Sequence, residues 1–167
     1  ESVALFLPDF LRKTVEPEQK KTFLVVVGRH GVKWPANELA AVLAHELVGH
    51  GVQHQRGRLS DIRDLDAECE AYLYEEIANQ NLGLDKRSRE MVAFRQGMED
   101  NFCSDFKTFM RKSRSSDMAL WDVLNPDVPK LLSIFEAYLD HSKSKGVTGK
   151  SLAAKKQLLQ ERRNRVL

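Results

Sequence analysis

The chain is poor in cysteine, with only Cys69 and Cys103 among its 167 residues. Two cysteines are too few for a dense disulfide framework, and their separation excludes a Cys-x-x-Cys metal pair. This low content is typical of a reducing compartment, so we expect a cytoplasmic location.

Long apolar runs are also missing. No segment approaches the roughly 18 residues that a membrane-crossing helix needs, and the run from Phe23 to Val27 is too short even for the core of a signal peptide. We therefore expect no membrane segment in this chain. Because the first residue is Glu1 rather than methionine, we expect a fragment or a processed product of a longer protein.

An excess of charge of one sign is absent, since 26 basic and 24 acidic residues give a net charge of +2. Such a balance excludes a strong overall field that would attract nucleic acid or an anionic membrane. A basic run near the end is typical of a solvated helix face, and no nucleic-acid-binding motif accompanies it. We therefore expect no nucleic-acid partner. The run comprises Lys155, Lys156, Arg162, Arg163 and Arg165.

The remaining composition is that of an ordinary globular protein, with 42% apolar and 30% charged residues and no internal repeat. At this length one well-buried domain is expected. We expect it to span residues 1–141, followed over residues 142–167 by a linker and a basic C-terminal helix.

Hydrophobic periodicity predicts a mainly α fold with a small β element, an α+β arrangement. Residues 21–28 are rich in β-branched side chains, and they form the only convincing strand, which we expect to be largely buried. The first helix is expected to follow a cap at Asn37 and to be mostly buried, because apolar residues recur in it at helical spacing. Those residues are Leu39, Val42, Leu43 and Leu47.

Three further helices are expected, over residues 65–79, 86–112 and 131–139. The first of them should end at Asn81 and Gly83. The second carries an apolar stripe that indicates core packing, formed by Met91, Phe94, Met98, Phe102, Phe106 and Phe109.

The chemistry in this sequence is concentrated in the first helix, which contains His45-Glu46-Leu47-Val48-Gly49-His50. Zinc peptidases commonly place two histidines four positions apart on one helical face, with a glutamate between them that activates water. Here the histidines are five positions apart, and an ideal α-helix would rotate the second ring by about 140° from the first. A π-bulge would restore a common side, and Gly49 lowers the steric cost of such a turn.

A zinc site also needs a third protein ligand, which in the glutamate type comes from the following, antiparallel helix. Glu68 is the natural candidate, because the 17 residues from 51 to 67 leave room for the reversal. Asp64, Asp66 and Glu70 are competitors for this role.

The whole constellation resembles that of the gluzincin metallopeptidases. The segment from His45 to His50 is similar to the His-Glu-x-x-Gly-His motif of the dipeptidyl peptidase III family, and Glu68-Cys69-Glu70-Ala71 matches that family's Glu-Cys-Arg-Ala motif at three of four positions. The resemblance covers roughly residues 22 to 75. It implies a minimal zincin-like core with additional C-terminal helices, Zn²⁺ held by His45, His50 and Glu68, and Glu46 as general base in peptide-bond hydrolysis.

The resemblance does not extend to exopeptidase specificity, because this chain and the gap between its two motifs are much shorter than in that family. Two alternatives stay open at this point. His54 forms a regularly spaced pair with His50, and it can instead lie behind the ligands or contact substrate. The second alternative is a catalytically silent, peptidase-like interaction module, against which the intact Glu46 argues. His30 and His141 are expected at the surface.

Overall fold

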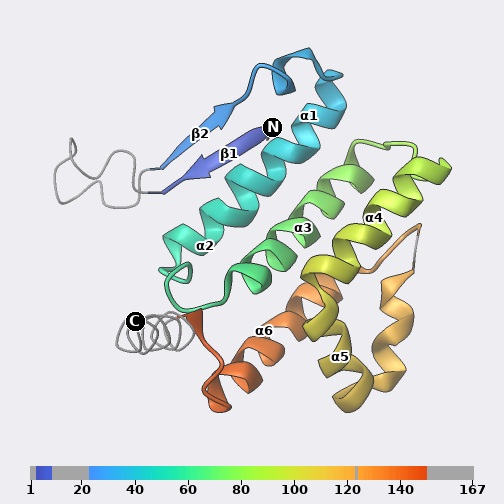
Figure 1. The fold of residues 1–167 in the computed structure, drawn as a ribbon. Coiled ribbons are helices and arrows are strands. Elements are labelled where there is room, and N and C mark those ends of the chain that lie inside the picture. Colours follow the sequence, from blue (N-terminus) through green and yellow to red (C-terminus); the bar gives the residue numbers. More distant parts are fainter. Residues whose placement is uncertain (1–2, 9–22, 123, 150–167) are drawn as a thin grey trace, which may run out of the picture.

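The computed structural model describes residues 3–8, 23–122 and 124–149, and their arrangement is mainly helical with one small sheet (Figure 1). This confirms the predicted fold class. The predicted basic helix from Ser151 to Leu167 lies outside the described residues. None of the described helices is long and apolar enough to cross a bilayer.

The sheet has two antiparallel strands, β1 (Ala4–Leu7) and β2 (Leu24–Val27), paired in the register Ala4 to Val27 and Leu7 to Leu24. The predicted strand is therefore present, but the expectation of a single strand is wrong. It is also less buried than expected, since Val26 exposes 42% of its surface. A two-stranded ribbon with helices against one side leaves its other side in solvent, which explains the exposure.

After a short 3-10 turn, η2 (Gly31–Lys33), one long helical rod carries the motif. It consists of α1 (Ala36–Ala44), a π-helical segment η3 (His45–His50) and α2 (Gly51–Gln55). The rod begins at Ala36 with Pro35 as its cap residue, two positions before the cap predicted at Asn37. Only one face is buried, so the expectation of a mostly buried helix is wrong. Leu47 and Val48 face solvent on the other side.

Helix α3 (Asp64–Asn81) returns beside this rod after a loop that turns at Gly57, where φ is +66°. The predicted helix over residues 65–79 is confirmed, and it ends before Gly83, whose φ of +62° suits glycine. Contacts of α3 with α1 and η3 form the interface on which the candidate site lies.

The predicted helix over residues 86–112 is in fact two helices, α4 (Arg89–Phe102) and α5 (Ser104–Ser113). The break falls at Cys103, which forms a buried disulfide with Cys69 of α3. The sequence analysis did not predict this disulfide. Because disulfides persist mainly in oxidising compartments, the cysteine content gives no support to a reducing one.

The apolar core lies around this disulfide, between α3, α5, η4 (Ser115–Trp121) and α6 (Val128–Ser144). Phe106 of the predicted stripe is buried there, whereas Phe94 is 53% exposed and does not belong to the core. Helix α6 is longer than predicted, extending into the expected linker as far as Ser144. Beyond it, the Gly149 N–H donates to the Asp61 carbonyl at 3.0 Å.

Candidate metal centre

The spacing of the two motif histidines is resolved by the π-helical turn. Residues His45 to His50 form that turn, so the extra residue is accommodated at the place where the five-residue spacing predicted a bulge. Both histidines are 8% exposed, and their ring centroids are 5.0 Å apart at an interplanar angle of 78°. The two imidazoles therefore lie on one side of the rod, and the predicted widening is confirmed.

Gly49 allows this turn to lie directly against α3. A Cβ atom at position 49 would be 2.6 Å from the Ala71 Cα and 2.7 Å from the Ala71 Cβ. Such distances are far below ordinary van der Waals contact, and the opposing atoms cannot swing away as a long side chain can. The glycine therefore permits a close approach of the two helices.

Glu68 of α3 completes the cluster. Its Oε2 lies 3.3 Å from His45 Nε2, and its Oε1 lies 3.5 Å from His50 Nε2. One potential ligand atom from each of these three residues lies within 4.8 Å of the other two. Two atoms that each bind a tetrahedral zinc ion at about 2.1 Å are separated by about 3.4 Å, so the donor set suits a small dication.

The competing acidic residues are placed elsewhere. Asp64 is exposed, and Asp66 is held by Arg63 at 2.7 Å and by the Tyr138 hydroxyl at 2.7 Å. Glu70 accepts a hydrogen bond from Arg58 at 2.7 Å. Among the described residues, the group able to share an ion consists of His45, His50 and Glu68.

The Nδ1 atom of each imidazole, the ring nitrogen that does not face Glu68, has a hydrogen-bond partner of its own. His45 Nδ1 lies 3.1 Å from Glu75 Oε2, and His50 Nδ1 lies 2.9 Å from Gln53 Oε1. Partners of this kind fix the ring orientation and the tautomer of metal-binding histidines. Sequence reasoning missed both residues. Glu75 follows Glu68 by seven positions, which places both on one helical face, and this spacing was a usable signal.

The direction of the Gln53 amide follows from its remaining contacts. Its Nε2 donates to the Ala67 carbonyl at 2.8 Å and to Glu70 Oε2 at 3.0 Å. Both of these oxygens accept hydrogen bonds, so Gln53 must offer its own oxygen to His50. His50 Nδ1 is therefore the donor in this bond, which leaves His50 Nε2 to face Glu68.

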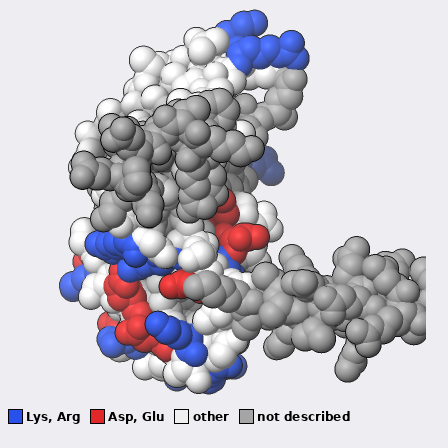
Figure 2. Space-filling view, turned by 90° about the vertical axis from the view of Figure 1, so that its left-hand side faces the viewer, with Lys and Arg blue, Asp and Glu red and all other residues white. Residues whose placement is uncertain are grey.

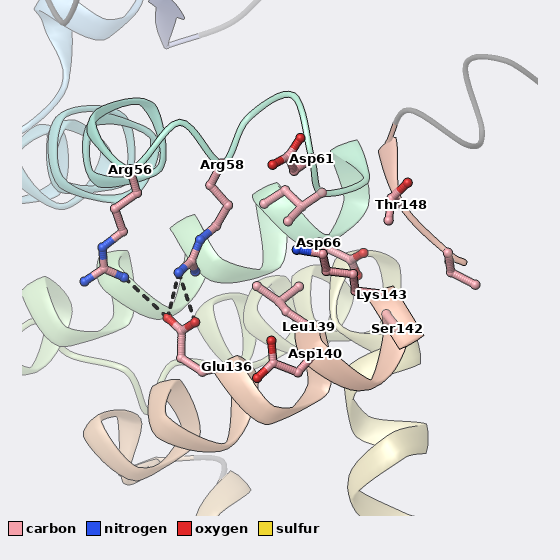
Figure 3. Close-up of a pocket in the computed structure, with 12 residues that line it drawn as sticks. Arg56, Arg58, Asp61, Asp66, Glu136, Leu139, Asp140, Ser142, Lys143 and Thr148 are labelled. Atoms are coloured by element: carbon pink, nitrogen blue, oxygen red, sulfur yellow. Dashed lines mark hydrogen bonds and ion pairs between the residues drawn. The ribbon is translucent and has the colours of Figure 1, made fainter. Parts of the chain in front are cut away.

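This network reaches the molecular surface through Arg58. The guanidinium contacts Glu70 on one side and Glu136 of α6 on the other, where its Nη2 lies 2.9 Å from Glu136 Oε2. Arg56 also converges on Glu136 (Figure 3). The result is a continuous series of polar contacts from an open, mixed-charge pocket to a candidate ligand.

The ionisation of the cluster reflects these contacts. Burial opposes the charged form of His45, but hydrogen bonds to Glu68 and Glu75 outweigh it and raise the pKa of His45 to about 9. Burial acts against ionised Glu68 as well, yet the two imidazoles lower the pKa of Glu68 to about 2. In the metal-free protein, protons thus supply the positive charge that a dication would bring.

Glu46 differs from Glu68 and Glu75 in its contacts. It is partly buried, and that burial raises its pKa above the ordinary value for glutamate. Among the described residues, Glu46 forms no hydrogen bond or ion pair. A carboxylate that is partly desolvated, next to a candidate metal site and without a hydrogen-bond partner is suited to exchange protons with water.

His54 is not part of the cluster. Its ring packs against Phe6 at 6.1 Å and Phe23 at 5.8 Å between centroids, and its Nε2 is buried with no hydrogen-bond partner in the described part of the chain. In the structure, therefore, His50 and His54 do not form the alternative pair of metal-binding histidines. His30 and His141 are exposed, as predicted.

Figure 2 shows the charged side chains on one face of the described residues. Acidic and basic side chains are interspersed over the lower part of this face.

Comparison with known proteins adds no relative: no protein-family model, curated protein or solved structure matches this chain. The gluzincin resemblance therefore stays a prediction that depends on the two motifs.

Proposed function

We propose that this protein is a zinc-dependent metallopeptidase, with a peptide or protein substrate. The observation that carries the proposal is the π-helical turn, which brings His45 and His50 to one side of the rod, facing Glu68. In an ordinary α-helix, a spacing of five would point the two histidines in different directions, and a π turn interrupts the regular hydrogen-bond pattern. Such turns are frequent at functional sites.

The donor set supports zinc among the common metals. Two imidazoles and one carboxylate form the ligand set of many catalytic zinc sites, whereas calcium and magnesium prefer oxygen ligands. When bound in such a set, zinc lowers the pKa of water to about 7 and polarises a carbonyl group. Glu75 and Gln53 support the set because they hold the Nδ1 atoms of its two rings.

Glu46 is the proposed general base. Its raised pKa improves its ability to accept a proton from the attacking water, and the same carboxyl group can return that proton to the leaving amine. In this way one carboxylate serves both halves of the hydrolysis. The alternative of a silent interaction module gives no role to a partnerless, partly buried glutamate in this position.

The sheet is the proposed support for an extended substrate. Strand β1 contacts η3, and the Phe6 ring lies 5.5 Å from the His50 ring. A peptide that pairs with an unpaired edge of a two-stranded sheet would be held by backbone hydrogen bonds.

The metal assignment is tested by zinc content after equilibration and desalting. We expect one zinc ion per chain in the wild type and loss of stoichiometric zinc in His50→Ala and Glu68→Ala. His54→Ala is the matched control, because His54 is close in sequence but outside the cluster, and it should retain zinc. The assignment is wrong if His54→Ala loses the metal while His50→Ala keeps it.

Catalysis is tested with Glu46→Gln on a mixed peptide library that is analysed by mass spectrometry. The substitution removes the base and retains the size of the side chain, so cleavage should fall by a factor of about 10² to 10⁴ while zinc content is unchanged. Asp64→Asn removes an exposed carboxylate at the start of α3, and it should cleave like the wild type. Equal cleavage by wild type and Glu46→Gln contradicts the mechanism, and zinc binding without any cleavage favours the interaction module.

A further inference from the structure

An apolar pocket of 280 Å³ lies between α1, α3 and α4, and we call it the helical pocket. Its walls include Val42 of α1, Tyr72 of α3, and Met91 and Phe94 of α4, and Trp34 also lines it. Trp34 and Phe94 are 41% and 53% exposed. Large aromatic side chains exposed at the mouth of an apolar cavity are typical of a binding site rather than of a packing defect.

The helical pocket lies beside the candidate metal centre, because α1 and α3 contribute residues to both. Val42 precedes His45 by three positions and Tyr72 follows Glu68 by four, so each lies about one helical turn, roughly 5 Å, from a proposed ligand and on the same helical face. Glu75 belongs to both sites, because it lines the pocket and contacts His45 Nδ1.

The separation of roughly 5 Å between the helical pocket and the proposed ligands corresponds to one or two residues of an extended peptide, in which neighbouring residues are about 3.4 Å apart. A residue next to, or one removed from, a carbonyl at the metal centre can therefore place its side chain in the helical pocket. The volume and the apolar lining suit a large side chain such as phenylalanine or leucine.

The charges around the helical pocket are predominantly negative. Glu38 of α1 and Glu90 of α4 are exposed and line it, whereas the charge of Glu75 is paired with His45. The cation on its wall is Arg95, whose Nη2 is already paired with the buried Glu76 at 3.0 Å. An occupant with a positive charge beside its apolar side chain therefore complements the rim, and an anionic occupant is repelled.

We propose that the helical pocket is the specificity pocket of this protein and binds a large apolar side chain of a peptide that carries a positive charge next to it. The proposal rests on the proposed peptidase function for the identity of the substrate, but the pocket itself can be tested without metal or catalysis. Three probes share one ring and differ in charge: phenylalaninamide is cationic, N-acetylphenylalaninamide is neutral, and N-acetylphenylalanine is anionic.

Binding of each probe to the full metal-free chain is measured from ¹H–¹⁵N chemical shifts. We expect saturable binding of the cation at concentrations on the order of millimolar, about fivefold weaker binding of the neutral probe, and no detectable binding of the anion. In the double variant Glu38→Gln and Glu90→Gln, the cation should bind with the affinity of the neutral probe. Equal affinity for all three probes in the wild type overturns the proposal.

Occupancy is tested by Val42→Trp, which fills the helical pocket and should abolish binding of all probes. Val147→Trp is the matched control, because Val147 is exposed and lies away from this pocket, and it should bind them as the wild type does. Unchanged binding in Val42→Trp refutes the assignment. A spectrum of native-like dispersion is required of both variants, so that misfolding is recognised.

The link to the substrate is tested with the peptide library described above. Wild-type cleavage should concentrate beside large apolar residues that have a basic neighbour, and Val42→Trp should lose this preference while keeping one zinc ion per chain. Cleavage without that preference overturns the specificity proposal and leaves the peptidase function standing. Probe binding that follows the expected order in a protein that cleaves nothing supports the pocket and counts against the peptidase function.

Discussion

Replacing Gly49 by alanine should disrupt the contact on which the candidate metal centre is built. The added Cβ would be 2.6 Å from the Ala71 Cα and 2.7 Å from its Cβ. Because these atoms belong to the opposing helix and its shortest side chain, relief requires a shift of the rod away from α3. Such a shift also separates both histidines from Glu68.

The size of the effect follows from two opposing contributions. Overpacking of this kind typically costs about 1 to 3 kcal/mol, and the rigid obstacle here favours the upper end. Alanine in place of glycine in a helix returns up to about 1 kcal/mol. The net loss is then about 2 kcal/mol, which for a chain of this length lowers the melting temperature by about 4 to 8 °C.

Gly97 in α4 is the matched control, since a Cβ atom there would meet no atom within 4 Å. Gly97→Ala should raise the melting temperature by about 1 to 4 °C, because only the helix-propensity contribution remains. The assay is thermal unfolding of metal-free protein, followed by zinc titration against a chelator. If Gly49→Ala is as stable as the wild type and binds zinc equally tightly, the close approach has no role in forming the site.

The other predictions concern the ligand support, the disulfide and the ionisation of the cluster. Gln53→Leu should weaken zinc binding about 10- to 100-fold in chelator competition, because His50 loses its hydrogen-bond acceptor, whereas Gln55→Leu at the exposed end of α2 should not. Reduction of the disulfide, which closes a sequence separation of 34, should cost about 4 kcal/mol in denaturant unfolding, and an unchanged midpoint would contradict its role. The pKa of His45 in the folded metal-free protein, about 9, lies above its ordinary value of 6.5. The stability contributed by this proton is complete below pH 6.5 and disappears as the pH rises through 9, so the melting temperature should fall over that interval, and His45→Gln should reduce the slope.

The helical rod of α1, η3 and α2 shows how much of the candidate site local sequence information can predict. A spacing of five between two histidines, together with Gly49, was enough to predict the widened turn, because helical geometry relates sequence distance directly to direction. The helical pattern of residues 65–79 then placed Glu68 on the next helix. The three candidate ligands were predictable as a group because they belong to two adjacent helices joined by one short reversal.

The errors arise where distant parts of the chain decide the local structure. Strand β1 has four residues, and only pairing with β2 makes it a strand. The helix predicted over residues 86–112 has an uninterrupted apolar pattern, yet it is divided at Cys103, where the disulfide to Cys69 links this part of the chain to α3. Phe94 was assigned to the core by its periodicity, which gives the direction of a side chain but not what lies opposite.

The sequence by itself determined the types of the candidate ligands, their order along the chain and the local widening that aligns the two imidazoles, because these depend on spacing within helices. The tertiary structure alone decided which groups contact the Nδ1 atoms of the two candidate histidine ligands. Gln53 and Glu75 became visible as partners of His50 and His45 only through the packing of the rod on α3. The contact of Gly49 with Ala71 sets the distance between those helices, and the positions of hydrogen-bond partners across an interface follow from that distance rather than from any pattern within one helix.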